Sequence, residues 1–391
     1  EEALMRGIEP GDTAFLLGCT ALVLMMTPAL ALFYGGLVRE RNVLSVMIQN
    51  FVCIGVVGII WVFGGFSLAF GPSVNGYIGD IRTYFGMHGI GVAADPAYAA
   101  NVPFILVFGY QMMFAIITPA LMTGAFVGRM RFAPFLWFVA LWTIFVYLPV
   151  AHWIWGGGFL SQLGVVDFAG GIVIHASAGA SALVTAIYLG RRPTGDSGPI
   201  PASLPMVALG AGLLWFGWFG FNAGGAYAAD GLAAYAFTNT MLVLVGAVTG
   251  LATITPASGY VEPMAALLIG AIGATCCYFA KYIQSWLKAE DTLEVFRAHG
   301  IGGITGSLLI GVLASPTINA VSAGTRQLSV QAIAVAIVVI YAVIVTTIIL
   351  FLLDKLSKLR VPVEVQREGL DEQYYGQSAY SLWGMRARKP D

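Results

Sequence analysis

The feature that most constrains this chain is a succession of long apolar runs that contain almost no charged residues. A helix that crosses a bilayer core needs about 20 apolar residues. Only 10% of the 391 residues are charged, whereas a soluble domain has roughly a quarter. We therefore predict an all-α polytopic membrane protein with eleven transmembrane helices. The predicted helices cover 13–37, 44–70, 102–127, 133–150, 170–189, 205–222, 232–243, 246–255, 263–282, 299–313 and 330–353.

Lysine and arginine residues are concentrated in alternate loops and in the segment after the last predicted helix. Sixteen of the 19 lie on one side of the membrane, and the other three are Arg6, Arg82 and Arg326. Cytoplasmic loops of membrane proteins carry the excess of positive charge. We therefore expect a multi-pass protein of the cell (inner or plasma) membrane, with its N-terminus outside and its C-terminus in the cytoplasm.

One segment is too short to contain the two membrane-spanning helices predicted in it. Residues 231–261, "GLAAYAFTNTMLVLVGAVTGLATITPASGYV", must supply the seventh and eighth helices and their connection. Two full spans alone need about 40 residues. Either the two helices are short, or a flexible segment is missing from this part of the sequence; we favour the missing segment.

The eleven predicted helices divide into two groups of five and one extra helix. An odd number of helices per group places the groups in opposite orientations, so we expect an inverted 5+5 repeat. Transporters with inverted repeats hold their substrate near the membrane midplane, between the repeats. The expected units are 1–190, 191–320, the eleventh helix at 321–358, and a cytoplasmic tail at 359–391.

The fifth and tenth predicted helices share a motif of ionisable residues. The fifth contains "DFAGGIVIHASAG", with Asp167 and His175, and the tenth contains "DTLEVFRAHGIGG", with Asp291 and His299. Eight residues, about 12 Å of helix, separate each aspartate from its histidine, and a glycine follows each histidine by four residues. We predict that the two helices cross near the centre and bring the imidazoles together. The inverted topology puts Asp167 at the outer entrance and Asp291 on the cytoplasmic side, where it anchors its helix.

Ionisable residues within a membrane usually line a substrate or proton path. A single buried histidine more often only hydrogen-bonds a neighbouring helix, but two in repeat-related positions favour a pore. No third metal-type ligand accompanies them, so we expect no metal site. The four cysteines lie in apolar runs without the spacing of a zinc or disulfide framework. No basic patch indicates a nucleic-acid partner, and no nucleophile–base pair indicates an enzyme or catalytic residues.

Aromatic residues at several predicted helix ends suggest a site for a small cation. They include Phe114 in "YQMMFAIIT", Trp155 in "AHWIWGGG", and Trp218 and Phe221 in "LLWFGWFGFNAGG". Such residues can be ordinary interfacial anchors, but aromatic faces also attract cations, by roughly 2 kcal/mol when desolvated. Complete desolvation of an ion costs tens of kcal/mol. A substrate that loses a proton to become neutral would avoid most of that cost.

These motifs occur together in a known family. The chain resembles the ammonium transporter (Amt/Mep/Rh) family over nearly its whole length, through "LFYGGLVR", "AHWIWGGGFLSQLGVVDFAGGIVIHASAG", "GWFGFNAGG", "ITPASGYV", "VFRAHGIGGITGSLLIGVLA" and "REGLD". The resemblance implies an eleven-helix fold, a homotrimer in the lipid bilayer with one pore per subunit, and no cofactor. It implies ammonium or ammonia as substrate, with methylammonium as a further candidate.

The resemblance also assigns roles to residues at the outer entrance. Trp155, Phe114 and Phe221 match the external recognition and gate residues, and Asp167 matches a buried carboxylate that supports recruitment of ammonium. Many family members have serine at the position of Gly225, where the hydroxyl helps to hold ammonium. Gly225 has no such group.

Deeper in the pore, His175 and His299 match the twin histidines of the family, and Trp218 matches a residue that faces them. The tail resembles the family's cytoplasmic arm, which contacts neighbouring subunits and PII-type regulators. In that arm Tyr375 and Gln377 stand where many members have histidine and glutamate.

Two functions remain open at this point. The first is a channel-like ammonium transporter. The alternative is an ammonium-sensing receptor with the same fold and little flux, coupled to a cytoplasmic signalling domain. The segment "SLWGMRARKPD" is either an ordinary tail or the start of a connection to such a domain. The absent hydroxyl at Gly225 and the short 231–261 segment favour the receptor slightly, and the pore motifs favour the transporter.

Overall fold

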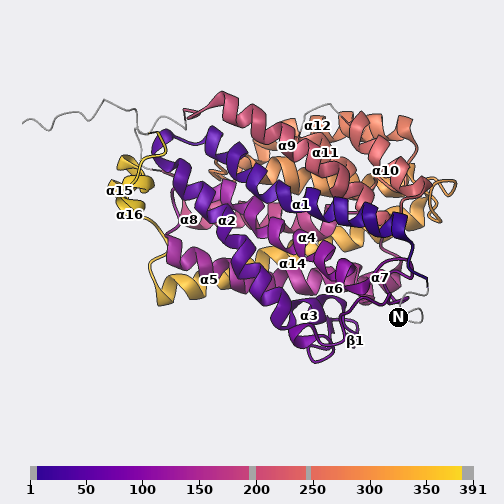
Figure 1. The fold of residues 1–391 in the computed structure, drawn as a ribbon. Coiled ribbons are helices and arrows are strands. Elements are labelled where there is room, and N and C mark those ends of the chain that lie inside the picture. The colour runs from indigo at the N-terminus through magenta and orange to yellow at the C-terminus, as the bar shows by residue number, and fades with distance from the viewer. Residues whose placement is uncertain (1–6, 193–199, 244–247, 381–391) are drawn as a thin grey trace, which may run out of the picture.

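The computed structural model describes residues 7–192, 200–243 and 248–380. The described chain is a bundle of long helices that run roughly side by side, with a small amount of irregular structure at each end (Figure 1). Its regular β structure is a hairpin of two-residue strands, β1 Ser73–Val74 and β2 Ile78–Gly79. The fold is therefore that of a helical membrane protein, as the apolar runs predict.

The helices of the first half, in chain order, include three π-helical segments (η2, η4 and η5) and two short 3-10 turns (η1 and η3). They are α1 Pro10–Leu37, η1 Glu40–Asn42, α2 Val43–Ile60, η2 Trp61–Gly65, α3 Phe66–Phe70, η3 Phe85–Met87, α4 Phe104–Phe126, α5 Phe132–Trp142, η4 Thr143–Tyr147, α6 Leu148–Ile154, α7 Phe159–Leu163, η5 Gly171–Ala176 and α8 Ser177–Leu189.

The second half contains one further π-helical segment, η7, and ends in two short helices. Its elements are α9 Leu204–Ala223, η6 Gly224–Ala226, α10 Gly231–Leu242, α11 Val248–Ile254, α12 Pro263–Trp286, η7 Phe296–Ile301, α13 Gly302–Leu313, α14 Thr325–Leu356, α15 Val363–Glu368 and α16 Leu370–Tyr375.

Nine helices of the described residues are long and apolar enough to cross a membrane. The two predicted helices that do not reach this length are α10, with 12 residues, and α11, with seven. At 1.5 Å per residue these helices measure about 18 Å and 10 Å, against a hydrocarbon core of about 30 Å. The prediction of a missing segment concerns their connection, where residues 244–247 lie outside the described residues.

The predicted helix at 44–70 is interrupted in the structure. Phe63 and Gly64 leave the helical conformation, and Gly64 has a φ of 123°, which favours glycine. A side chain at Gly64 would also approach Ile81 of the following loop to 3.0 Å. Hydrophobic periodicity cannot reveal such a break, because both sides of it remain apolar. The predicted helix at 133–150 instead continues to Ile154, and Trp155 follows directly.

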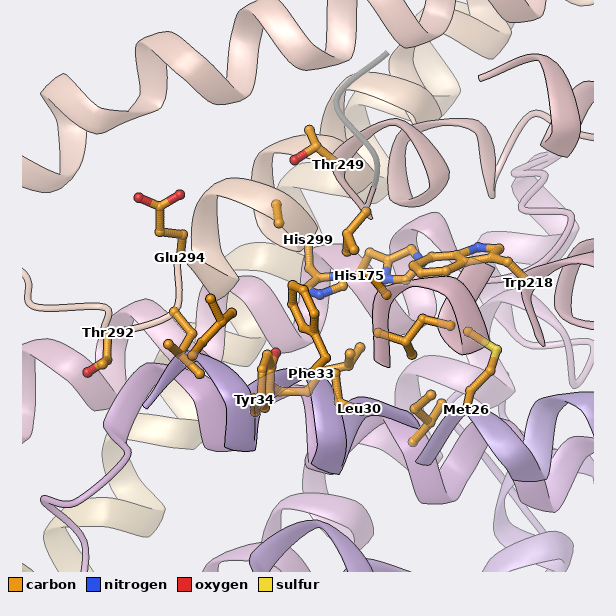
Figure 2. Close-up of a pocket in the computed structure, with 18 of the residues that line it drawn as sticks. Met26, Leu30, Phe33, Tyr34, His175, Trp218, Thr249, Thr292, Glu294 and His299 are labelled. Carbon is orange, nitrogen blue, oxygen red and sulfur yellow. Dashed lines mark hydrogen bonds between the residues drawn. The ribbon is translucent and has the colours of Figure 1, made fainter. Parts of the chain in front are cut away.

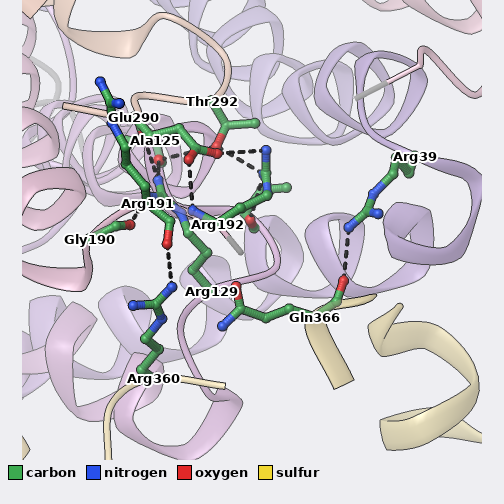
Figure 3. Close-up of polar contacts among 11 residues, drawn as sticks. Arg39, Ala125, Arg129, Gly190, Arg191, Arg192, Glu290, Thr292, Arg360 and Gln366 are labelled. Carbon is green, nitrogen blue, oxygen red and sulfur yellow. Dashed lines mark hydrogen bonds and ion pairs between the residues drawn. The ribbon is translucent and has the colours of Figure 1, made fainter. Parts of the chain in front are cut away.

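We call the end of the bundle that carries residues 71–103 the loop end, and the other end the arginine end. At the arginine end the fully buried Arg129 donates to the carbonyls of Gly190, Ala125 and Glu290. Arg192 forms an ion pair with Glu290, with 2.9 Å between the guanidinium and carboxylate (Figure 3). These contacts join the ends of α4 and α8 to the segment before η7.

The segment after α14 packs against the same end. Asp371 of α16 is buried and accepts hydrogen bonds from the backbone N–H groups of Leu44 and Ser45, at 2.9 and 2.8 Å, and from the Ser45 hydroxyl. Arg39 donates to the carbonyl of Gln366 (Figure 3). A carboxylate beside free N–H groups at a helix start is a stabilising cap, so α16 completes the first turn of α2.

Candidate functional site

The two predicted histidines meet in the middle of the bundle. His175 lies in η5 and His299 in η7, and their Nδ1 atoms are 3.2 Å apart. The rings are stacked, with centroids 5.1 Å apart and an angle of 22° between their planes. Both side chains are buried. The structure therefore brings together the residues on which the sequence prediction depends (Figure 2).

Glycines allow the two helices to cross at the histidines. A side chain at Gly179 would lie 2.2 Å from the Cα of Gly300, and one at Gly303 would lie 2.3 Å from the carbonyl oxygen of Gly171. Each crossing glycine follows its histidine by four residues, which places it on the same face of the helix one turn later. The repeated glycines of the motif thus have a packing role: they let the backbones approach closely enough for the imidazoles to touch.

The hydrogen bond between the histidines restricts which ring nitrogens carry protons. One Nδ1 must donate and the other must accept, so a single proton lies between the two rings when both are neutral. Nε2 of His175 is buried and has no hydrogen-bond partner among the described residues. The pair therefore offers one free buried nitrogen to a small polar molecule.

The carboxylate of Asp167 is bonded to the backbone at the start of the helix that carries His175. Its two carboxylate oxygens accept four backbone N–H groups at 2.6–3.0 Å, those of Gly170, Gly171, Ile172 and Val173. Because all four contacts are accepted, the ionised carboxylate fits this position. The seven residues between Asp167 and His175 are not all helical, since η5 begins only at Gly171. The aspartate instead folds back and caps the helix.

Asp291 has a different environment at the start of the second motif. One carboxylate oxygen accepts the backbone N–H of Phe296 at 2.7 Å. The other, Oδ1, is buried without a hydrogen-bond partner in the described part of the chain. Burial raises the pKa of Asp291 to about 6, although the backbone N–H groups of Phe296 and Val295 and the Arg129 guanidinium lower it. Asp291 anchors its helix, as expected, but by fewer contacts than Asp167 makes.

Two phenylalanine rings separate the histidines from the loop end. Phe114 of α4 and Phe221 of α9 are buried, with ring centroids 4.5 Å apart. Trp155 lies 6.1 Å from Phe114 on the loop-end side, and its indole N–H donates to the backbone carbonyl of Asp167. Phe221 lies 6.0 Å from the His175 ring on the other side. The residues predicted for recognition and gating therefore form a continuous series.

A cavity lies on each side of the phenylalanine pair. The loop-end cavity has a volume of about 310 Å³ and is lined by residues that include Trp155, Asp167, Gln111, Gly225 and Tyr227. The arginine-end cavity has a volume of about 420 Å³, and both histidines line it.

Figure 2 shows the histidines and Trp218 of the arginine-end cavity opposite Phe33 and Tyr34 of α1. Trp218 stacks on His175 at 5.6 Å, and its indole N–H donates to the Thr255 hydroxyl at 2.8 Å. This hydrogen bond fixes the indole ring beside the imidazole.

Gly225 lies at the loop-end cavity close to the backbone. A side chain here would meet the carbonyl oxygen of Phe168 at 2.9 Å and its ring at 3.2 Å. The nearby Tyr227 belongs to no motif that predicts a role, and its hydroxyl lies 2.5 Å from Nε2 of Gln111. Its position follows from a φ of 55° at Tyr227 itself, a conformation uncommon for residues other than glycine. No sequence pattern signals that turn.

In the described residues, no group of three or more histidine, cysteine, aspartate or glutamate side chains could hold a metal ion. The four cysteines are free, and all but Cys276 are buried. The polar groups of the site are thus imidazoles, amides, hydroxyls, the capped Asp167 carboxylate and the Glu294 carboxylate of the arginine-end cavity.

Comparison with known proteins agrees with this arrangement. The sequence model of the Ammonium Transporter Family matches residues 14–247 and 241–380. This chain belongs to that family. It is 41% identical to an ammonium transporter of Aquifex aeolicus, over 96% of this chain and 94% of the relative. It is also 41% identical to an ammonium transporter of Bacillus subtilis, over 95% and 99% of the two chains.

Solved structures of this family have the same fold. The crystal structure of Saccharomyces cerevisiae Mep2 superposes with a TM-score of 0.85 at 32% identity, covering 92% of this chain and 89% of that one. A structure described as a Sensor Amt Protein superposes with a TM-score of 0.84 at 26% identity, covering 93% and 98%. The Amt/Mep resemblance found in the sequence is confirmed.

The family match is interrupted at one place. Its two stretches meet and overlap at residues 241–247, between α10 and α11. The alignment with the Aquifex relative extends over 406 residues, more than the 391 of this chain. The overlap of the two matched stretches locates a departure from the family pattern at the connection between α10 and α11.

Proposed function

We propose that this chain is an ammonium transporter in which NH4+ is recruited at the loop-end cavity, loses a proton at the phenylalanine pair, and crosses as ammonia past the two histidines. The observation that carries the proposal is the order of the groups along one line: Trp155, then Phe114 and Phe221, then His175 and His299. Membership of the Ammonium Transporter Family supports the substrate.

The cost of dehydration explains why a proton must leave at the phenylalanine pair. Two phenyl rings with centroids 4.5 Å apart and planes tilted by 46° offer no hydrogen-bond acceptor to an ion. Cation–π attraction returns roughly 2 kcal/mol, whereas a bare ion in apolar surroundings costs tens of kcal/mol. Ammonia is neutral and avoids that cost, so the rings select the conjugate base. Trp155 and Phe114 supply the aromatic faces that first attract the cation.

Asp167 acts in this proposal as a positioning residue. A helix N-terminus carries roughly half a positive charge, which would repel a cation from the loop-end cavity. The carboxylate of Asp167 occupies all four N–H groups there and reverses the local charge. It thereby supports recruitment without a direct contact to the ion.

The histidine pair provides the path beyond the rings. Its single shared proton and the free Nε2 of His175 allow one ring to donate and the other to accept as ammonia passes. The same hydrogen bond offers a route for the proton that NH4+ leaves behind. Trp218 limits the width of the path by stacking on His175.

We also propose the finer architecture that the sequence predicts: eleven spans in an inverted 5+5 repeat, with units at 1–190, 191–320, 321–358 and 359–391. The matching π-helical segments η5 and η7 support the repeat, because each contains a histidine and is followed by a helix, α8 or α13, with a crossing glycine in its first turn. In this orientation the loop end faces outward and the arginine end faces the cytoplasm. The homotrimer and contacts between α15–α16 and a PII-type regulator remain part of the proposal.

The receptor alternative is favoured by one finding, the similarity to a structure described as a Sensor Amt Protein. A sensor needs the recruitment site but not the path past the histidines. The two functions therefore differ in flux and not in binding.

Ammonium-induced current in proteoliposomes separates the two functions. The purified protein is reconstituted in lipid vesicles, and ammonium chloride is added in steps. The transporter proposal expects a current that saturates with ammonium concentration and is absent from protein-free vesicles. Calorimetric titration on the same preparation measures binding. Tight binding without current would establish the receptor and overturn the transporter.

A further inference from the structure

The loop-end cavity contains a polar pair that the pathway described above does not use. Gln111 lies on α4 one turn before Phe114, and Tyr227 lies just after η6. Both line the cavity beside Trp155. The amide nitrogen of Gln111 and the phenol oxygen of Tyr227 are 2.5 Å apart. The pair therefore joins two helices across the wall where the substrate enters.

This hydrogen bond leaves one strong acceptor without a partner. The Gln111 side chain is 7% exposed, and its Oε1 has no hydrogen-bond partner among the described residues. A buried amide oxygen without a donor costs roughly 1–3 kcal/mol. Since the amide nitrogen donates to Tyr227, the phenol oxygen also keeps one lone pair and its own proton. Two oxygens of this wall thus keep unused hydrogen-bonding capacity.

The backbone holds Tyr227 in an unfavourable conformation to make this contact. Its φ of 55° lies in the left-handed region, which costs about 1 kcal/mol or more outside glycine. The Asn101 side chain donates to the Tyr227 carbonyl at 2.8 Å and to Asp12 at 2.7 Å. The Tyr227 N–H donates to the carbonyl of Gly224. Strain of this kind persists only where surrounding contacts hold it, and it is concentrated at functional positions.

The carboxylate and the indole of the cavity are already occupied. All four acceptor positions of the Asp167 carboxylate are filled by backbone N–H groups. The Trp155 indole is a donor and is bonded to the Asp167 carbonyl. Gly225 contributes no side-chain group, and its close approach to Phe168 leaves little room for one. Among the buried side chains that line this cavity in the described part of the chain, Gln111 alone has an oxygen without a hydrogen-bond partner.

We infer that the Gln111 amide oxygen and the Tyr227 phenol oxygen form the acceptor pair that holds ammonium in the loop-end cavity. The inference rests on the proposed function and adds two substrate-binding residues to it. NH4+ carries four N–H donors, so it can satisfy both oxygens while another face lies against Trp155. Sodium or potassium could also coordinate these oxygens, so the pair supplies affinity, and the phenylalanine pair excludes ions that cannot lose a proton.

The test compares Tyr227→Phe and Gln111→Met with the wild type in the proteoliposome current assay. Each variant is expected to raise the half-saturating ammonium concentration five- to tenfold, since tenfold corresponds to about 1.4 kcal/mol. The maximal current should stay within twofold, because the phenylalanine pair and the histidines are unchanged. The double variant should lose little more affinity for ammonium than either single variant, since both residues contact the same ion.

Tyr235→Phe is the matched control, because Tyr235 lies on α10 with 38% of its surface exposed and does not line the cavity. It should leave half-saturation unchanged. Thermal unfolding of all variants reports whether a loss of affinity follows from a loss of folding. A Tyr227→Phe protein that unfolds leaves Gln111→Met as the deciding variant.

The outcomes separate this inference from the transporter proposal. A saturable wild-type current with the same half-saturation in both variants overturns the acceptor pair and keeps the transporter. Absence of wild-type current overturns the transporter. In that case, calorimetric titration with ammonium chloride decides the inference: weaker binding to both variants supports the pair, and unchanged binding overturns it.

Discussion

The two aspartate–histidine motifs have the same spacing but different chemistry. In the first, the Asp167 carboxylate accepts four backbone N–H groups and has no acceptor left over. In the second, Asp291 accepts one, and its Oδ1 is buried without a partner in the described structure. The histidines that follow are nearly equivalent, since they face each other through the same ring nitrogen. The motif has thus kept its geometry at the histidines and diverged at the carboxylates.

This difference indicates that the two halves of the molecule face different requirements. The loop-end cavity touches Asp167, so the helix start there must present no net positive charge to a cation. Asp291 does not line the arginine-end cavity, although Thr292, Leu293 and Glu294 do, and the Glu294 carboxylate is paired with Arg297. A neutral molecule that leaves through that end needs no such compensation. The asymmetry of the carboxylates therefore fits a path on which charge is handled at one end.

The largest loss of stability is expected for Asp167→Asn, which tests the difference between the two carboxylates directly. Asparagine can accept through only one oxygen, and its amide nitrogen would face N–H groups that it cannot bond. Hydrogen bonds to a charged group contribute about 1.5–3 kcal/mol each, so the free energy of unfolding should fall by at least about 3 kcal/mol. Thermal unfolding in detergent measures the loss.

The matched control for that variant is Asp291→Asn, the same chemical change at the same place in the second motif. Asparagine keeps one oxygen for the Phe296 N–H. The unfolding free energy at pH 7 should therefore stay within about 1 kcal/mol of the wild type. If the two variants lose stability equally, the two carboxylates do not differ in how much their hydrogen bonds stabilise the fold.

A smaller effect is expected in the pH dependence of stability, through Asp291. Burial raises the pKa of Asp291 to about 6 from an unfolded value of 3.8. Between these values the folded state holds a proton that the unfolded state has released. Stability from this group therefore falls as pH rises from about 4 to about 6 and is constant above that range. Asp291→Asn should remove this slope, which unfolding midpoints measured at intervals from pH 4 to pH 8 would reveal. An identical slope in both proteins would contradict the assignment.

Much of the site was predictable because duplicated residue patterns carry geometric information. Two histidines with equal spacing to an aspartate and to a glycine implied two related helices that cross, and the structure has this crossing at Gly179 and Gly303. Long apolar runs predicted helices because the membrane permits little else.

Other features could not be read from the sequence for physical reasons. The capping of η5 by Asp167 depends on non-helical residues between 167 and 170, where spacing suggested a continuous helix. The break at Gly64 and the position of the Tyr227 hydroxyl both depend on positive φ angles. The packing of α16 against α2 depends on contacts between residues more than 300 positions apart.

The central claim is that ammonium crosses this molecule past the two histidines. Its most direct test is the ammonium-induced current of His175→Asp in proteoliposomes, with wild type reconstituted at the same density. The account predicts a saturable wild-type current and a current in the variant reduced at least about 100-fold, because a charged, hydrated carboxylate replaces the imidazole that ammonia must pass. Wild-type protein that binds ammonium tightly without current, or a variant that conducts as well as the wild type, would contradict it.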